Sequence, residues 1–346
     1  MDVTIAAILL QDGITTGAIY ALMALVTVLV FTVTRVILVP AGEFVAFGAL
    51  TLATLQRGGV PGTVKLLVAA ALIAGAIEVA SAARRGQFAA LPRALAGLVA
   101  VPLLIAATVA WAASRQWPLA AQGLLALAAV TPLGPLLYRI AYQPIAEATV
   151  LVLLIVSVGV HFVLMGLGLY FFGAEGWRTP AFVQGSIGTD AVTISGQSLV
   201  VVAVSALLML ALAVFFSRTL RGKALRATAV NRVGARLMGI STTYAGMLAF
   251  GLAAFVGALS GVLVAPIATV YYDSGFLIGL KGFVGAILGG LVSYPLATVG
   301  ALAVGVLESF SSFWASDYKE IIVFTLVLPA LLYRSLRHPH REEEEA

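Results

Sequence analysis

Long apolar segments recur along this chain, and they restrict its possible folds more than any other feature. A helix of about 20 apolar residues crosses the hydrocarbon core of a bilayer. The sequence predicts eleven such spans, near residues 5–33, 37–55, 63–80, 94–113, 119–138, 147–172, 198–216, 244–270, 276–292, 296–314 and 320–334. We therefore expect an all-α, polytopic transmembrane bundle.

Composition supports one membrane domain. Of the 346 residues, 61% are hydrophobic and 10% are charged, whereas soluble domains carry about 25% charged residues. The polar stretches are too short for a separate core, so residues 1–336 are interpreted as a single domain. Residues 337–346 form a charged tail, in which four consecutive Glu residues repel one another. Since the basic residues lie in loops between spans, no nucleic-acid partner is expected.

The sequence contains no recognisable catalytic or metal site. Cysteine is absent, and so are the HExxH, GxSxG and GxxxxGK[ST] patterns. His338 and His340 flank Pro339, a pattern that favours a solvated tail over a metal site. His161, alone on an apolar span, is interpreted as a packed histidine bonded to a backbone carbonyl. We expect no cofactor on this chain, and any ATP would be hydrolysed by another chain.

The segment 218–239 carries six of the twenty Lys and Arg residues and no Asp or Glu. Short basic loops remain in the cytoplasm. With this loop inside, fourteen basic residues are cytoplasmic and five are external, which predicts an external N-terminus and a cytoplasmic C-terminus. The cytoplasmic residues are Arg35, Arg84, Arg85, Arg93, Arg139, Arg218, Arg221, Lys223, Arg226, Arg232, Arg236, Arg334, Arg337 and Arg341, and the external ones are Arg57, Lys65, Arg115, Arg178 and Lys319.

The same segment has helix-forming residues and ends at Gly239, a natural helix stop. It is interpreted either as a helix that meets a soluble partner or as a plain topogenic loop. On the other side, the loop 173–196 contains β-forming residues, and it either docks an external partner or serves as a connector.

Ionisable residues at membrane depth are costly and indicate function. Four of those in or near the predicted spans stand out, namely Glu43, Glu78, Lys281 and Glu308. Glu78 is expected to reach the interface beside Arg84 and Arg85.

Glu43 follows Pro40, Ala41 and Gly42 in the Gly-rich segment 37–55, which we expect to be broken or re-entrant. Its carboxylate either accepts backbone N–H groups at the break, the favoured alternative, or binds a substrate ammonium group.

Lys281 lies between Gly279 and Gly282 in a second Gly-rich segment, 276–292. It is expected to neutralise Glu43 or Glu308, or to meet a substrate carboxylate. Broken segments in both halves of a chain indicate a transport pathway. The predicted pathway residues are Gly42, Glu43, Gly279, Lys281, Gly282 and Glu308. The GxxxG pairs Gly257/Gly261 and Gly285/Gly289 are expected to serve internal helix packing, with a subunit interface as the alternative.

Four stretches carry a resemblance to a known family. They are GAIYALMALVTVLVFTVTRVILVPAGEF (17–44), YRIAYQPI (138–145), GKALRATAVNRVGARLMGIS with the following AFGLAAFVGALSGVLVAP (from 222), and LKGFVGAILGGLVSYPLATVGALAVGVLESF with SDYKEIIVF (from 280). The chain resembles the permease subunits of branched-chain amino acid ABC importers.

The resemblance implies a bacterial inner-membrane subunit without enzyme activity. Its expected partners are two ATP-binding subunits, which hold ATP and Mg, a second permease subunit and a periplasmic substrate-binding protein. Urea, a short amide or another small metabolite is an alternative cargo. An ion-coupled secondary transporter, with Glu43 and Glu308 as the coupling site, is the alternative from another class.

By this resemblance, residues 226–239 look like the coupling helix that docks on the ATPase. The residues expected to couple are Arg226, Asn231, Arg232, Gly234, Ala235, Arg236 and Gly239. Val233 occupies the position at which the family has Glu. Residues 38–41, directly before Gly42, replace the Asn-Phe-Ala-His sequence of the family. Residues 57–118 are predicted to be an insertion of two spans.

Overall fold

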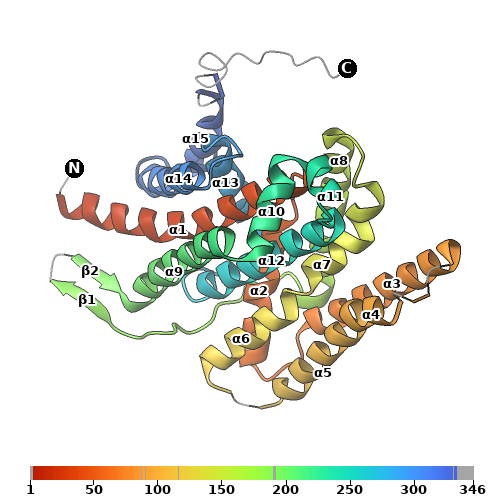
Figure 1. The fold of residues 1–346 in the computed structure, drawn as a ribbon. Helices are drawn as coiled ribbons and strands as arrows, with labels where there is room; N and C mark the ends of the chain where they lie inside the picture. Colours follow the sequence, from red (N-terminus) through yellow and green to blue (C-terminus); the bar gives the residue numbers. More distant parts are fainter. Residues whose placement is uncertain are drawn as a thin grey trace.

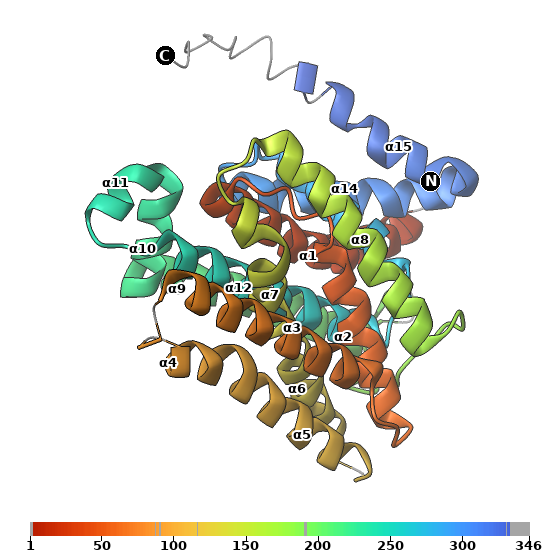
Figure 2. The same ribbon diagram turned by 90° about the vertical axis from the view of Figure 1, so that its right-hand side faces the viewer.

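The computed structural model describes residues 3–86, 88–89, 91–115, 117–189, 192–329 and 331–332. Within them the chain is a bundle of helices with one β-hairpin (Figures 1 and 2). The long helices are α1 (Val3–Thr34), α3 (Gly62–Arg85), α8 (Val150–Phe172), α9 (Gly196–Arg218), α12 (Thr242–Val264) and α14 (Tyr294–Trp314). The shorter α-helices are α2 (Ala41–Gln56), α4 (Leu91–Leu95), α5 (Val101–Ala113), α6 (Leu119–Val130), α7 (Leu133–Leu137), α10 (Leu220–Val230), α11 (Arg232–Leu237), α13 (Ser274–Leu288) and α15 (Lys319–Thr325). Short π- and 3₁₀-helical turns are η1 (Ala96–Ala100), η2 (Tyr138–Tyr142), η3 (Gln143–Ile145) and η4 (Ser316–Tyr318).

The membrane character of the chain is confirmed. In the described residues, eight helical segments are long and apolar enough to cross a bilayer, and they include the composite segments Leu91–Ala113 and Leu119–Ile145. Segment 244–270 was predicted too long, since α12 ends at Val264 and Pro266 cannot continue the helical hydrogen bonds. Of the last predicted span, 320–334, the structure shows α15 up to Thr325, a turn at residue 326 and helical residues at 327–329 and 331–332. The rest of that span lies outside the described residues, as does the tail 337–346.

Both Gly-rich segments form helices that, taken alone, are shorter than the hydrocarbon core. Helix α2 has 16 residues and α13 has 15, so each is about 23 Å long, against about 30 Å for the hydrocarbon core. Helix α13 is continuous through Gly279 and Gly282, so the predicted break at Lys281 is wrong. The helix instead ends beyond Leu288, where Gly290 and Leu291 both have positive φ.

Helices α1, α2, α12, α13 and α14 form the centre of the bundle. The contact between α2 and α13 is backbone on backbone, because a Cβ atom on Gly42 or on Gly275 would overlap the other residue. The GxxxG pairs also serve internal packing, as predicted. Gly257 and Gly261 of α12 face α2, whereas Gly285 and Gly289 of α13 face α14.

The break between α1 and α2 is held by α8. Ser157 donates a hydrogen bond to the Ile37 carbonyl at 2.7 Å and accepts one from the Val39 N–H at 3.2 Å. The Tyr142 hydroxyl oxygen lies 3.0 Å from the hydroxyl oxygen of Ser157. Arg35 has a φ of 62° as the chain leaves α1. The shape of this break thus depends on Ser157 rather than on the carboxylate of Glu43.

Residues 173–196 include the hairpin β1 (Ser186–Thr189) and β2 (Val192–Ser195), which pair antiparallel. Before the hairpin, the loop lies against the end of α12. Trp177 and Val270 exchange two backbone hydrogen bonds of 2.9 Å, and the Thr179 N–H donates to Ala265 at 3.1 Å. This part of the loop therefore caps α12.

Helices α4 and α5 run end to end through η1, and together they lie beside α3 at one edge of the bundle (Figures 1 and 2). They occupy most of the predicted insertion 57–118. Glu78 of α3 binds Arg139 at 2.6 Å, a partner that the sequence did not indicate. The guanidinium of Arg139 is buried and requires a carboxylate, and this pair ties α3 to η2.

Candidate functional site

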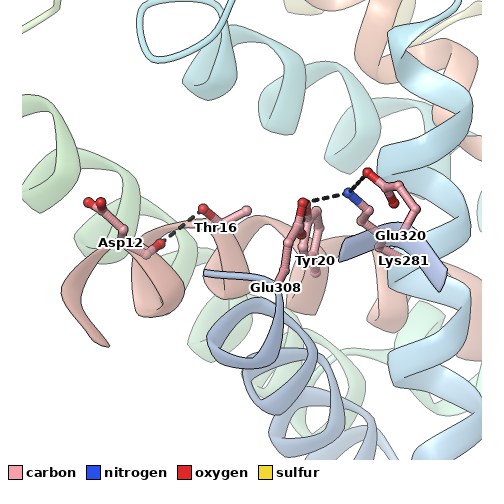
Figure 3. A network of polar contacts seen from close by, with 6 residues as sticks. All are labelled: Asp12, Thr16, Tyr20, Lys281, Glu308 and Glu320. Carbon is pink, nitrogen blue, oxygen red and sulfur yellow. Dashed lines mark hydrogen bonds and ion pairs between the residues drawn. The ribbon is translucent and has the colours of Figure 1, made fainter. Parts of the chain in front are cut away.

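A polar network crosses the apolar bundle where α1, α13, α14 and α15 meet (Figure 3). The Lys281 Nζ atom of α13 lies 2.6 Å from Glu308 Oε1 and 3.0 Å from Glu320 Oε1. The second oxygen of Glu308 accepts a 2.6 Å hydrogen bond from the Tyr20 hydroxyl. Of the expected partners, Lys281 thus pairs with Glu308 and not with Glu43. Glu320 was not singled out from the sequence, because it stands beside the exposed end of α14.

This network carries a net negative charge. Lys281 supplies one positive charge, and the two carboxylates around it supply two negative ones. The lysine side chain is 6% exposed and Glu308 is 15% exposed. An isolated ion at this depth costs several kcal/mol, so the mutual pairing is what makes the buried lysine tolerable.

A polar cavity of about 330 Å³ opens beside the network, between α1 and α14. Five of its eight lining residues are polar, namely Asp12, Thr16, Glu308, Ser309 and Ser312. Asp12, Thr16 and Tyr20 follow one another at four-residue spacing on α1, so they lie on the same helix face as Figure 3 shows. Asp12 and Ser312 are exposed. A carboxylate facing lipid is unfavourable, so this face suits water or another protein surface.

Glu43 lies in the first turn of α2 and is fully buried. Its Oε1 atom is 2.9 Å from Nδ1 of His161 on α8. The two atoms do not have hydrogen-bond geometry, and neither has another hydrogen-bond partner in the described part of the chain. The carboxylate therefore contacts a histidine instead of the backbone N–H groups that we expected, and His161 faces a carboxylate instead of a backbone carbonyl.

The predicted pathway glycines lie at helix contacts. Gly42 and Gly279 are in contact across α2 and α13, since a Cβ on Gly279 would be 2.9 Å from the Gly42 Cα. Gly282 faces Met23 of α1. These positions bring the short helices α2 and α13 close to α1, and Lys281 is held among them.

The segment 218–239 forms two helices, α10 and α11, instead of one (Figure 2). Asn231 separates them, with extended backbone angles and a side chain that accepts the Gly234 N–H at 2.8 Å. Gly239 has a φ of 80°, which permits the turn toward α12. The sequence offers Asn231 as a residue that can cap a helix, but it does not indicate that the helix breaks after Val230.

Two of the arginines in α11 bind this chain itself. Arg232 donates to the Ala146 carbonyl at 3.1 Å, and Arg236 binds Glu147 at 3.0 Å and Thr242 at 3.1 Å. They fix α11 against the turn that follows η3. They are therefore less free to meet a partner than the sequence indicated.

Apolar side chains form the exposed surface of the two helices. Val230 is 88% exposed, Val233 68%, Leu237 83% and Met238 82%. Beside them is a hollow of about 500 Å³, whose lining includes Arg226, Asn231, Gly234 and Ala235. We call Val230, Val233, Leu237 and Met238 with this hollow the α10–α11 surface. Exposed apolar clusters of this kind mark protein contacts.

Comparisons with known proteins agree on one family. The model of the family described as "Branched-chain amino acid transport system / permease component" matches residues 9–331. The high-affinity branched-chain amino acid transport system permease protein LivH of Salmonella typhimurium is 32% identical over 238 residues, which are 66% of this chain and 77% of that protein. The corresponding permease protein BraD of Pseudomonas aeruginosa is 30% identical over 248 residues, 70% of this chain and 76% of BraD. No solved structure matches the chain.

Proposed function

Because the chain belongs to the permease family of branched-chain amino acid transport systems, we propose that it is the membrane subunit of an ATP-driven importer for these amino acids. An external binding protein delivers the cargo, and two ATPase subunits on the cytoplasmic side supply the energy. A second permease subunit completes the pathway in the bacterial inner membrane. The N-terminus lies outside and the C-terminus inside, as the distribution of basic residues predicts.

The observation that carries this proposal is the α10–α11 surface. Four large apolar side chains are exposed on short helices outside the membrane spans, and the small residues Gly234 and Ala235 lie among them. Small residues allow a helix to seat deeply in the cleft of a partner. The contacts of Arg232 with Ala146 and of Arg236 with Thr242 connect this surface to the bundle, so that a movement of the ATPase is transmitted to α12.

The polar cavity between α1 and α14 supplies the pathway. The polar surface of α1 and α14 around this cavity requires a polar environment. A second permease subunit that encloses the cavity from the other side provides that environment. The cargo is a zwitterion with an ammonium group, for which Asp12 and Glu308 are suitable partners, while hydroxyl groups at Thr16 and Ser309 replace part of its hydration shell. Because Lys281 already neutralises Glu308, the cavity attracts an ammonium group only weakly, as an importer fed by a tight binding protein requires.

An ion-coupled transporter is less well supported. That alternative needs Glu43 and Glu308 in one coupling site, yet each pairs with a different residue, His161 and Lys281 respectively. Uptake that persists without an ion gradient while ATP is present separates the two classes.

The test is co-purification of the tagged chain with its ATPase from mild detergent. We expect Val233→Asp and Leu237→Asp each to remove the ATPase from the preparation. Val183→Asp is the matched control, because Val183 is also an exposed valine, 48% accessible, in the loop predicted to lie outside. Retention of the ATPase by both test variants would refute docking at this surface, and the absence of any ATPase from the native preparation would refute the importer.

A further inference from the structure

A second cavity, of about 440 Å³, lies between α1, α9, α12 and the start of α14. Its walls are apolar along most of its length, with residues such as Leu25 of α1, Met209 and Phe216 of α9, and Tyr294 of α14. Phe216 and Tyr294 stack at a centroid distance of 5.5 Å. We call this cavity the α9 groove.

Polar groups gather at one end of the α9 groove. Ser217, at the end of α9, and Arg226, in the second half of α10, line it there. From Met209 to Ser217 the helix rises about 12 Å. The groove therefore has an apolar length of that size and one cationic end, a shape that fits an acyl chain attached to an anionic group.

Arg226 has the charge for such a ligand. It is exposed, and no ion pair joins it to a carboxylate in the described ranges, in contrast to Arg236, which binds Glu147. The segment from Ser217 to Gly239 contains no acidic residue. Guanidinium groups bind phosphate oxygens with two parallel hydrogen bonds. Ser217 lies beside Arg226 in the lining, with its hydroxyl donating to the Val214 carbonyl at 3.2 Å.

The surroundings of the groove indicate a lipid. Helix α9 is mostly exposed, and Leu207, Leu210 and Val214 are 66%, 63% and 50% accessible beside the groove. Such a surface in a membrane protein faces acyl chains. Basic pockets between membrane helices on the cytoplasmic side are suited to anionic head groups, and the cytoplasmic position of this end rests on the proposed function.

We propose that the α9 groove binds one anionic glycerophospholipid, with an acyl chain along α9 and the phosphate at Arg226 and Ser217. Arg226 also lines the hollow of the α10–α11 surface. The bound head group thus lies next to the docking surface, and the anionic lipid content of the membrane affects how firmly α10 is held there.

The experiment is native mass spectrometry of the transporter purified from mild detergent, with added phosphatidylglycerol or phosphatidylcholine of identical chains. We expect the native protein to retain phosphatidylglycerol preferentially. Arg226→Gln should lower its retention by about fivefold, as expected for one basic residue at an anionic lipid surface, and leave phosphatidylcholine unchanged. Ala213→Trp, which fills the groove, should lower the retention of both lipids.

Arg221→Gln is the matched control, because Arg221 is an exposed arginine of the same helix that does not line the groove. An equal loss of phosphatidylglycerol retention in Arg221→Gln and Arg226→Gln would mean that the lipid is held by general electrostatic attraction, and it would overturn the site. Equal retention of phosphatidylglycerol and phosphatidylcholine by the native protein would also overturn the site. A cross-link from Ser217→Cys to the second permease would place a protein in the groove instead. Lipid retention is measured without transport or ATPase, so its outcome is separate from that of the proposed function.

Discussion

Lys281 Nζ and Glu308 Oε1 lie 2.6 Å apart, and this ion pair joins α13 to α14 in the middle of the bundle. The same lysine reaches Glu320 of α15, and the same glutamate accepts the Tyr20 hydroxyl of α1. Four elements therefore depend on one buried positive charge. The polar cavity that we assign to the pathway begins at this glutamate.

Replacement of Lys281 tests how much its ion pairs contribute to the stability of the protein. Lys281→Met leaves two carboxylates without a cation, and we expect a loss of about 3 kcal/mol in stability, measured as thermal unfolding in detergent. Adding Glu308→Gln to the same chain should recover most of the loss, since one of the two unpaired charges is then removed. Lys65→Met, at an exposed lysine of α3, is the control. Equal melting temperatures for all variants would contradict the buried pair.

The α2–α13 contact gives a second prediction. In Gly275→Ala the new methyl group would meet the Gly42 backbone, and Ala46 Cβ lies only 3.1 Å from the same position. We expect a destabilisation of about 2 kcal/mol, seen as a lower melting temperature and a lower membrane yield. Gly159→Ala is the control, since nothing lies within 4 Å of a Cβ there. A tolerated Gly275→Ala would show that α2 and α13 are packed less closely.

The sequence predicted those features that individual residues determine locally. Gly239 was expected to end the basic helical segment, and it has the required positive φ. The GxxxG pairs of α12 and α13 were expected at helix contacts and lie there. The short helices α2 and α13 occur in the two segments whose glycine content indicated interrupted spans.

The partners of the charged residues were not predictable in the same way. Glu78 finds Arg139, 61 positions away, and Lys281 reaches Glu320 in a segment that was read as another span. Helices that are apolar on all sides carry no hydrophobic stripe to show which neighbour each face meets. The role of Ser157 was missed for a related reason, because a lone serine in an apolar helix ordinarily bonds to its own backbone.

The polar cavity predicts a transport phenotype. Asp12→Asn removes a carboxylate that we propose as a partner of the cargo's ammonium group, and we expect the maximal rate of leucine uptake to fall about tenfold, as for the loss of one hydrogen bond to a charged group. The half-saturating concentration should stay the same, because the binding protein sets it. Asp317→Asn, at an exposed aspartate of η4 away from the cavity lining, should transport normally. Normal uptake by Asp12→Asn would remove this cavity from the pathway.

Glu43 provides the last prediction, because a carboxylate in the pathway and one inside the packing respond differently to substitution. The side chain is fully buried against His161, so the cargo does not reach it in this conformation. We expect Glu43→Gln and His161→Leu each to lower stability by about 1 kcal/mol, since each removes one of the two buried polar groups that lie against each other. The uptake ratios of leucine, isoleucine and valine should be unchanged in both variants. Competition uptake assays measure these ratios, with membrane yield followed in parallel. A changed ratio at normal yield would place Glu43 on the pathway, whereas reduced yield with constant ratios is the result that the buried pair requires.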